Sequence, residues 1–249
     1  PGQGEEKPSG GLVDSRGMKA PAGWPPTWPL LLFAAVAGAC SVVLRGALDG
    51  PFISDDGGYI VANLYLRDLS LENVAAFFDP GSPAQIYAVG NYSPIHMLLH
   101  ALEWQMFADH TFGYHLVNVL VHALACTLLA ALLLESRVPP TAVLVGVLIF
   151  AVHPVVSESV NYVSSRSSLL ATFFLLLACK GLGSALGGRA QRDWPLVAAT
   201  YCGALLAKSI AIVFPLLAGM YMGLVGRWRR GWLGALVAIA MLYVLGTRA

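Results

Sequence analysis

Long apolar runs dominate this chain and limit the folds open to it. Hydrophobic residues make up 57% of the sequence and charged residues 12%, whereas a soluble domain carries about a quarter of its residues charged. Several runs approach the ~20 residues that a helix needs to cross a ~30 Å hydrocarbon core. The short alternating segments typical of outer-membrane barrels are absent from the sequence. The sequence therefore predicts an all-α, polytopic membrane protein.

The expected spans are separated by short polar connections. They cover residues 29–48, 113–134, 141–152, 167–186, 195–225 and 232–245. The 195–225 stretch should form two short helices that are broken near Lys208. Lys and Arg gather in the connections on one side and Asp and Glu on the other, which places the N-terminus in the cytoplasm. Residues 1–28, rich in Gly, Pro and charge, are expected to be a disordered cytoplasmic tail.

Two outer loops on the acidic side carry most of the polar groups. The first covers residues 49–112 and should contain helices near 69–78 and 94–107. The second covers residues 153–166 and is expected to sit partly within membrane depth, because the span before it is short.

Two polar stripes have helical spacing. His96, His100 and Glu103 share one face of the 94–107 helix, opposite an apolar face, which is typical of a helix lying in the membrane interface. Metal binding by these three side chains is geometrically possible, and an interfacial polar face is the simpler interpretation. A second stripe in the 113–134 span is interpreted as a set of residues that hold neighbouring helices together by hydrogen bonds. It consists of His115, Asn118 and His122.

Acidic residues in both outer loops are candidates for chemistry. Asp55 and Asp56 follow the first span directly. Taken alone, the pair is better interpreted as two solvated charges in a Gly-rich turn. Taken together with the other outer polar groups, it could supply a general base. His153, Glu158 and Arg166 stand in the second loop. For them, loop capping with a simple Glu158–Arg166 ion pair and a catalytic role are both open interpretations. The four cysteines lie in apolar runs at unrelated spacings and predict no disulfide frame.

Five segments together resemble a known family. They are "FISDDGGYI", "NYSPIHMLLHALEWQMF", "FGYHLVNVLVHALAC", "LIFAVHPVVSESVNYVSSRSSLLATFFLLLA" and "LLAKSIAIVFPLL". Their order and spacing resemble the transmembrane and tetratricopeptide-repeat O-mannosyltransferases and their bacterial relatives, which are GT-C glycosyltransferases using lipid phosphosugars. The resemblance implies a GT-C-type helix bundle, with residues 29–249 forming part of the transmembrane domain of a longer protein.

The resemblance also implies roles for individual residues. Asp55 corresponds to the catalytic carboxylate, Asp56 to its acidic neighbour and Glu158 to a second-loop acid, which the turn at His153 places. Arg166 and Lys208 become candidates for the donor phosphate, and Tyr92 for substrate contact. The chain departs from the family at three places, where it reads Tyr92-Ser93-Pro94, Arg166-Ser167-Ser168 and Ala207-Lys208-Ser209.

The implied activity is an inverting transfer of a mannose-like sugar from a polyprenyl-phosphate donor to a hydroxyl of a protein or glycan acceptor. The site would face the periplasm or the lumen, in a bacterial inner membrane or the endoplasmic reticulum membrane. Membrane lipids are expected partners, and nucleic acid is not. No cofactor is implied, and the question whether a divalent metal takes part stays open. The alternatives are a transporter or lipid flippase with a polar pathway through the bundle, and a non-catalytic scaffold.

Overall fold

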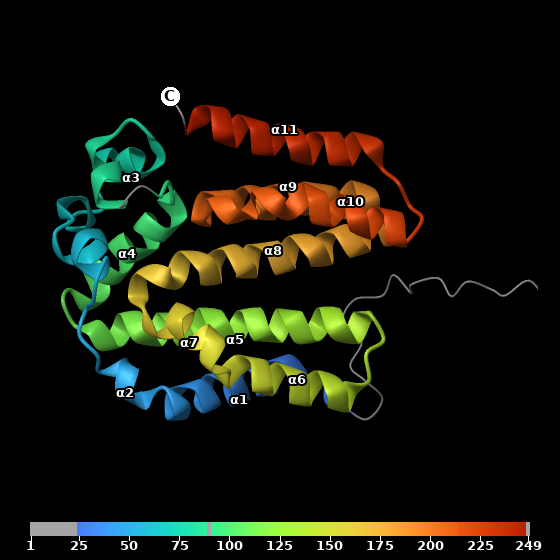
Figure 1. Ribbon diagram of the computed structural model, residues 1–249, viewed down its shortest axis with the longest axis horizontal. Coiled ribbons are helices and arrows are strands. Elements are labelled where there is room, and N and C mark those ends of the chain that lie inside the picture. The colour runs from blue at the N-terminus through green and yellow to red at the C-terminus, as the bar shows by residue number, and fades with distance from the viewer. Residues whose placement is uncertain (1–23, 89–90, 248–249) are drawn as a thin grey trace, which may run out of the picture.

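The described part of the protein is built from helices alone. The computed structural model describes residues 24–88 and 91–247, and these residues contain no strand. Figure 1 shows long helices lying side by side, with the first outer loop gathered as a cap at one end. The predicted all-α class is confirmed. Most of the predicted tail lies outside the described residues, and Trp24, near its end, packs on the first helix through an edge contact with Trp28.

The long helices of the bundle match the predicted apolar runs closely. They are α1 (Trp28–Val43), α5 (Thr111–Glu135), α6 (Pro140–Val152), α8 (Arg166–Ser184), α9 (Ala190–Ala207), α10 (Phe214–Leu224) and α11 (Arg230–Gly246). The other elements connect them. These are α2 (Arg45–Leu48), η1 (Gly57–Val61), η2 (Leu64–Leu66), α3 (Leu71–Phe78), η3 (Pro83–Ala88), α4 (Pro94–Phe107), α7 (Pro154–Asn161), η4 (Val163–Ser165), η5 (Ala185–Arg189) and η6 (Ser209–Val213).

Two segments of the described chain are long and apolar enough to cross a membrane. They are Thr111–Glu135 and Val163–Gly188, and a third candidate is the pair α6 and α7, which is bent by 57°. The remaining apolar helices, among them α1 and α11, are shorter than 18 residues. The structure thus supports a membrane protein with fewer full-length spans than the sequence analysis expected.

The two ends of the bundle differ in charge. At one end, here called the acidic end, lie the first outer loop, α7 and the last turn of α11 (Figure 1). At the other, the basic end, lie the turns from α5 to α6 and from α10 to α11, which contain Arg137 and the Arg227–Arg230 segment. The predicted break near Lys208 is confirmed, because α9 ends at Ala207 and Lys208 is extended, with φ −161° and ψ 135°.

Close packing of α8 and α9 depends on small residues. A Cβ at Gly181 would stand 2.9 Å from a methyl carbon of Val197, and a Cβ at Gly203 would stand 3.1 Å from the Phe174 ring. Small residues let helix backbones approach in membranes, where apolar surface alone gives little drive for association. This pair of helices brings Arg166, at the start of α8, and Lys208, just after α9, to the acidic end.

The second outer loop is more helical than expected. Pro154 ends α6 and is also the first residue of α7, a position where proline loses no intrahelical hydrogen bond. His153 caps this helix, since its Nδ1 accepts a hydrogen bond from the Val155 amide at 3.1 Å. The predicted helix near 69–78 is confirmed as α3, and the Ser70 hydroxyl caps it by accepting from the Asn73 amide.

Candidate active site

The adjacent aspartates Asp55 and Asp56 occupy opposite environments. The Asp56 side chain is completely buried. Its Oδ1 accepts hydrogen bonds from the amide and the hydroxyl of Ser164, and its Oδ2 accepts one from the Ile53 amide at 3.0 Å. A carboxylate that accepts several such bonds is firmly held. Asp56 therefore joins the first outer loop to the segment just before α8.

Asp55 stays exposed while its backbone is held. Its amide donates a hydrogen bond of 2.9 Å to the Tyr162 hydroxyl, which belongs to the second outer loop. The preceding residue, Ser54, has a φ of 48°, in the left-handed region that favours glycine. Such backbone conformations cost energy and persist where surrounding contacts enforce them. The turn thus presents the Asp55 carboxylate to solvent at the joint between the two loops.

Glu158 lies on the short helix next to this joint. It is exposed on α7, and its carbonyl accepts the Tyr162 amide at 2.9 Å. His153, at the other end of α7, is also exposed and serves as the cap described above. Glu158 therefore sits one helical turn before the tyrosine that holds Asp55. The simple Glu158–Arg166 pair considered for this loop is wrong, because Arg166 pairs with a different acid.

Arg166 is the centre of a buried polar network. Its side chain is completely buried, and Nη1 forms an ion pair with Glu103 on α4. Nε donates to the Asn118 side chain, and Nη2 donates to the Tyr114 carbonyl at 2.7 Å. The guanidinium thus ties α8 to both α4 and α5. It is not presented to a ligand surface, where a phosphate-binding arginine would lie.

The network continues along α4 through two histidines. His100 Nδ1 lies 3.0 Å from a Glu103 carboxylate oxygen, and its Nε2 lies 2.7 Å from His96 Nε2. All three side chains are at most 2% exposed, whereas Leu102 is 44% and Met106 72% exposed on the opposite face. The expected interfacial polar face is therefore wrong. The helix bounds agree with the prediction, but its polar face turns inward to meet Arg166.

Burial shifts the protonation of these groups. It raises the pKa of Glu103 to about 7, against the opposing effect of the Arg166 charge and hydrogen bond. Burial also lowers the pKa of His96 and of His100 well below 6.5, and the positive charge of Arg166 acts in the same direction. Both histidines are therefore neutral near pH 7, and one can donate to the other. In the described residues, no group of three acidic, histidine or cysteine side chains has the arrangement of a metal site.

Tyr59 links the Asp55 turn to this network. Its ring lies 5.0 Å from the His96 ring, and its phenol contacts the side chains of Asn91 and Ser93. Burial raises the pKa of Tyr59; the contacts with Asn91 and Ser93 oppose this shift, and the nearby Asp55 carboxylate adds to it. The charge of Asp55 therefore acts on the buried phenol of Tyr59, whose ring lies beside His96 in the core of the cap.

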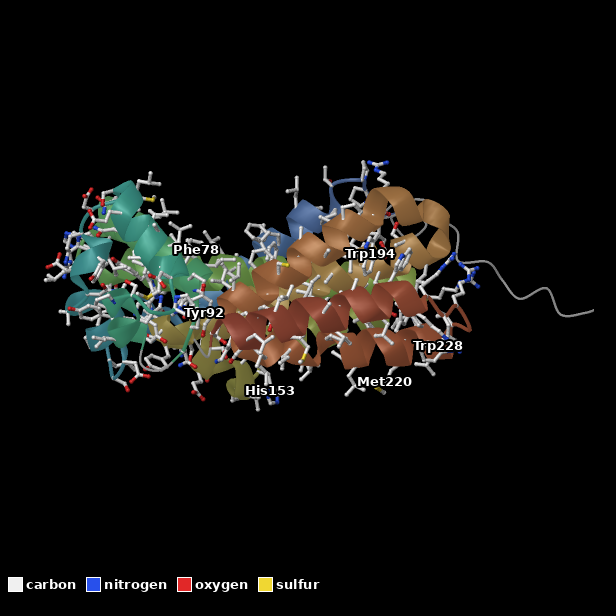
Figure 2. All side chains as sticks on the ribbon, turned by 90° about the horizontal axis from the view of Figure 1, so that it is seen from above. Phe78, Tyr92, His153, Trp194, Met220 and Trp228 are labelled. Carbon is white, nitrogen blue, oxygen red and sulfur yellow. The ribbon has the colours of Figure 1, made fainter. Side chains whose placement is uncertain are left out.

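Tyr92 and Lys208 meet in a pocket of about 610 Å³ at the acidic end. Tyr243 of α11 also lines it, and its hydroxyl donates to the Tyr92 carbonyl at 3.3 Å. The Lys208 ammonium donates to the Ser168 hydroxyl at 2.7 Å, and its charge also lowers the pKa of His96. Figure 2 shows Tyr92 beside the cap, His153 near the middle of the bundle and Trp228 toward the opposite end. Asn91 lines the same pocket and contacts Tyr59, which connects the pocket to the Asp55 turn.

Asn118 and His122, two of the three residues in the α5 stripe, hold helices together as predicted. The Asn118 amide nitrogen donates to the Val160 carbonyl at 2.9 Å, and His122 Nε2 lies 3.1 Å from the Ala151 carbonyl. Both contacts join α5 to the α6 and α7 segment. Each of the four cysteines is free, and Cys40 and Cys126 are buried.

Four residues of the site were missed or given another role by the sequence analysis. Tyr162 and Ser164 lie within the quoted second-loop segment, but no spacing connects them to Asp55 and Asp56. Tyr59 follows the aspartates by one turn and reads as an ordinary aromatic residue. Glu103 had a usable signal, because an acid within an apolar helix calls for a partner of opposite charge.

The chain is similar to part of several curated proteins. It is 30% identical over 176 residues to protein O-mannosyl-transferase TMTC4 of Homo sapiens, which is 63% of this chain and 23% of that protein. It is 28% identical over 206 residues to protein O-mannosyl-transferase Tmtc3 of Drosophila melanogaster, which is 73% of the chain and 22% of that protein.

Protein O-mannosyl-transferase Tmtc1 of Drosophila melanogaster is 30% identical over 184 residues, 72% of the chain and 21% of that protein. The alignments therefore span only about a quarter of the length of these relatives. No protein-family model and no solved structure matches the chain. The resemblance that the five segments predicted is confirmed: the chain is similar in sequence to the transmembrane O-mannosyltransferase family.

Proposed function

We propose that this chain forms part of a membrane glycosyltransferase that moves a mannose-like sugar from a polyprenyl phosphate to an acceptor hydroxyl at the acidic end of the bundle. The observation that carries the proposal is the Asp55 turn. Its carboxylate is exposed, while its backbone and its neighbour Asp56 are fixed by the second outer loop. A general base has to be both reachable and held in place. The curated relatives, all named protein O-mannosyl-transferases, support the same reaction class.

The reaction follows from the chemistry of the residues. The Asp55 carboxylate takes the proton of the acceptor hydroxyl, whose oxygen forms a bond to the anomeric carbon. The bond between that carbon and the phosphate oxygen breaks on the opposite face, so the electron pair leaves with the polyprenyl phosphate and the anomeric configuration inverts. A cation near the leaving phosphate stabilises the developing charge.

Lys208 is the cation best placed for this step. It lines the pocket at the acidic end. The guanidinium of Arg166, in contrast, is buried and binds Glu103, Asn118 and Tyr114. Arg166 is thus a positioning residue that holds α4 against α8, and Asp56 positions the Asp55 turn. Glu158 is an exposed acid on α7 in the second outer loop and is assigned to acceptor binding.

The proposal is tested with Asp55→Asn in membranes supplied with a polyprenyl-phosphate mannose donor and a peptide acceptor. Asn keeps the size of the side chain and removes the base, so we expect transfer to fall by a factor of about 10² to 10⁴. Donor binding should persist, because Lys208 is untouched. Glu72→Gln, which changes an exposed acid on α3, is the matched control and should retain activity.

Normal transfer by Asp55→Asn would remove this residue from its role. Transport of a solute into vesicles without any sugar transfer would instead favour a transporter. The buried stripe of α5 argues against such a pathway, since Asn118 and His122 use their polar atoms to hold neighbouring helices.

A further inference from the structure

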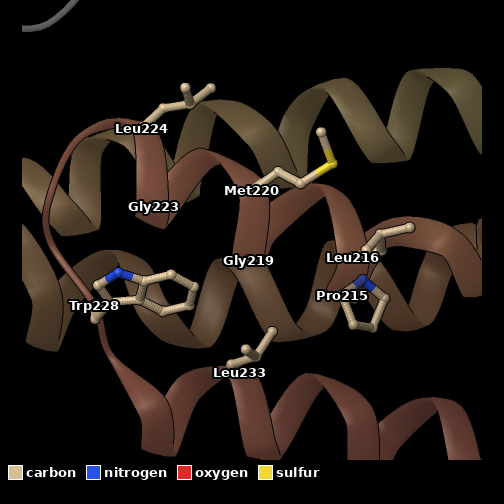
Figure 3. Close-up of a pocket in the computed structure, with 8 residues that line it drawn as sticks. All are labelled: Pro215, Leu216, Gly219, Met220, Gly223, Leu224, Trp228 and Leu233. Atoms are coloured by element: carbon tan, nitrogen blue, oxygen red, sulfur yellow. The ribbon is translucent and has the colours of Figure 1, made fainter.

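A second pocket lies on α10 near the basic end, far from the Asp55 turn. Its volume is about 590 Å³ and its lining is apolar. Figure 3 shows Leu216, Met220 and Leu224 from α10 around it, with Trp228 and Leu233 on the side of α11. The helix face toward the pocket is smooth where glycines replace side chains, at Gly219 and Gly223. The result is a groove along the helix.

The groove opens to the outside of the bundle. Leu216, Met220 and Leu224 are 68%, 58% and 86% exposed, and they belong to an apolar helix. From Pro215 to Leu224 the groove follows α10 for roughly 14 Å at 1.5 Å per residue. In a bilayer such a surface faces lipid chains, so the groove is open to an occupant from the membrane.

The groove is narrow. A Cβ at Gly219 would stand 3.6 Å from the methyl carbons of Leu233, so the walls formed by α10 and α11 nearly meet beneath it. A hydrocarbon chain lying along this floor would contact both helices.

Positive charge marks the basic end of the groove. Trp228 lines the groove, and Arg229 and Arg230 follow it directly, both exposed. The Arg229 guanidinium lies 5.6 Å from the centre of the Trp232 ring, and within the described residues neither arginine forms an ion pair. Arg227, in contrast, donates to the Leu186 carbonyl and so fixes the turn.

We propose that this groove binds an anionic phospholipid, with one acyl chain between α10 and α11 and the headgroup phosphate at Arg229 and Arg230. Tryptophan at headgroup depth and basic residues beside a crevice between helices are the chemistry that recognises such a lipid. Arginine suits the phosphate because its fork of donors can hold two phosphate oxygens. The site lies at the opposite end of the bundle from Asp55 and is independent of the proposed transfer reaction.

Quenching of tryptophan fluorescence tests the proposal. The purified full chain is placed in phosphatidylcholine nanodiscs that contain a minor fraction of phosphatidylglycerol with brominated acyl chains. The signal of Trp228 is obtained by subtracting the Trp228→Phe variant. The comparison sample carries the bromine on phosphatidylcholine at the same mole fraction.

We expect Trp228 to be quenched more strongly by brominated phosphatidylglycerol than by brominated phosphatidylcholine. Each arginine near an anionic headgroup strengthens binding about fivefold, so Arg229→Gln with Arg230→Gln should abolish the preference. Arg45→Gln, an exposed arginine at the acidic end, is the matched control and should keep it. Gly219→Leu should reduce quenching by both lipids, because its side chain fills the groove.

Three outcomes would overturn the proposal. Equal quenching by the two lipids would show that the arginines select no headgroup. No quenching by either lipid would show that protein covers Trp228, from this chain or a second copy. A preference that persists in Arg229→Gln with Arg230→Gln would show that other groups select the anionic headgroup. Far-ultraviolet circular dichroism of each variant checks that the helices are intact.

Discussion

The acidic and basic ends of the bundle use charge in opposite ways. At the acidic end, Arg166 and Asp56 are completely buried, and each joins segments that are far apart in the sequence. At the basic end, Arg229 and Arg230 are exposed on a single turn and form no ion pair within the described residues. A charge taken out of water has to be matched by partners, so it becomes part of the fold. A charge left in water is free to meet a ligand.

The strongest way to break this comparison is to remove the buried cation. Arg166→Leu leaves the Glu103 carboxylate and the Asn118 amide without their partner inside the bundle, so we expect a loss of about 3–5 kcal/mol in the free energy of unfolding. Arg230→Gln at the basic end should change it by less than about 0.5 kcal/mol. Denaturant unfolding in one detergent measures both variants.

Arg166→Leu combined with Glu103→Leu should recover part of that loss, because no buried charge is then left unmatched. A double variant as unstable as the sum of the two single ones would show that the two side chains act separately. Similar losses for Arg166→Leu and Arg230→Gln would remove the distinction between the two ends.

The aspartate pair provides a finer comparison within the acidic end. In Asp56→Asn the hydrogen bonds from Ser164 and Ile53 become weaker, and the new NH₂ group faces other donors instead of acceptors. We therefore expect a loss of about 1–3 kcal/mol in the free energy of unfolding. Asp55→Asn should cost less than about 0.5 kcal/mol while lowering sugar transfer by a factor of about 10² to 10⁴. Thermal unfolding and the transfer assay, run on the same preparations, separate the two roles. A greater loss of stability for Asp55→Asn would reverse the assignment.

The smallest expected effect per step, measured for each pH unit, is a pH dependence of stability that originates in α4. Below pH 6.5 the unfolded chain protonates both His96 and His100, whereas in the folded protein their pKa values lie well below this. Glu103 acts oppositely, since its pKa rises from 4.5 to about 7 on folding. Two protons favour the unfolded state and one favours the folded state, so these groups lower stability by about 1.4 kcal/mol per pH unit as the pH falls from 6.5 toward 4.5.

The double variant His96→Leu with His100→Leu leaves only Glu103 and should reverse the contribution of α4. Its stability relative to the unmodified chain should rise as the pH falls through this window. Unfolding curves at a series of pH values measure the difference between the two proteins. Parallel curves would show that the histidines are protonated in the folded state.

The sequence predicted the helices well and their contacts poorly. The break at Lys208, the helix near 69–78 and the bounds of α4 were all predicted, because each depends on neighbours within a few residues. The buried face of α4 was predicted wrongly. Local periodicity separates a polar face from an apolar one, but it does not tell which of the two is buried. In a membrane protein the apolar face can be the exposed one.

The candidate site shows the same division. Asp55, Asp56 and Lys208 were found because they interrupt apolar surroundings or match family segments. Tyr162, Ser164 and Tyr59 carry no such signal, since tyrosine and serine are common at helix ends and in turns. Only the fold shows that the Tyr162 hydroxyl accepts the Asp55 amide and that Ser164 holds Asp56.

Hydropathy and charge order along the chain determined by themselves that the protein is a bundle of apolar helices with an acidic and a basic end, because both depend on composition over successive segments. Only the tertiary structure decided which charges are buried. Asp56 and Arg166 become structural because residues about 110 and 60 positions away in the chain supply their partners, whereas Asp55 keeps a carboxylate open to solvent. The physical reason is the high cost of removing a charge from water without a partner, and the presence of that partner depends on how distant segments pack.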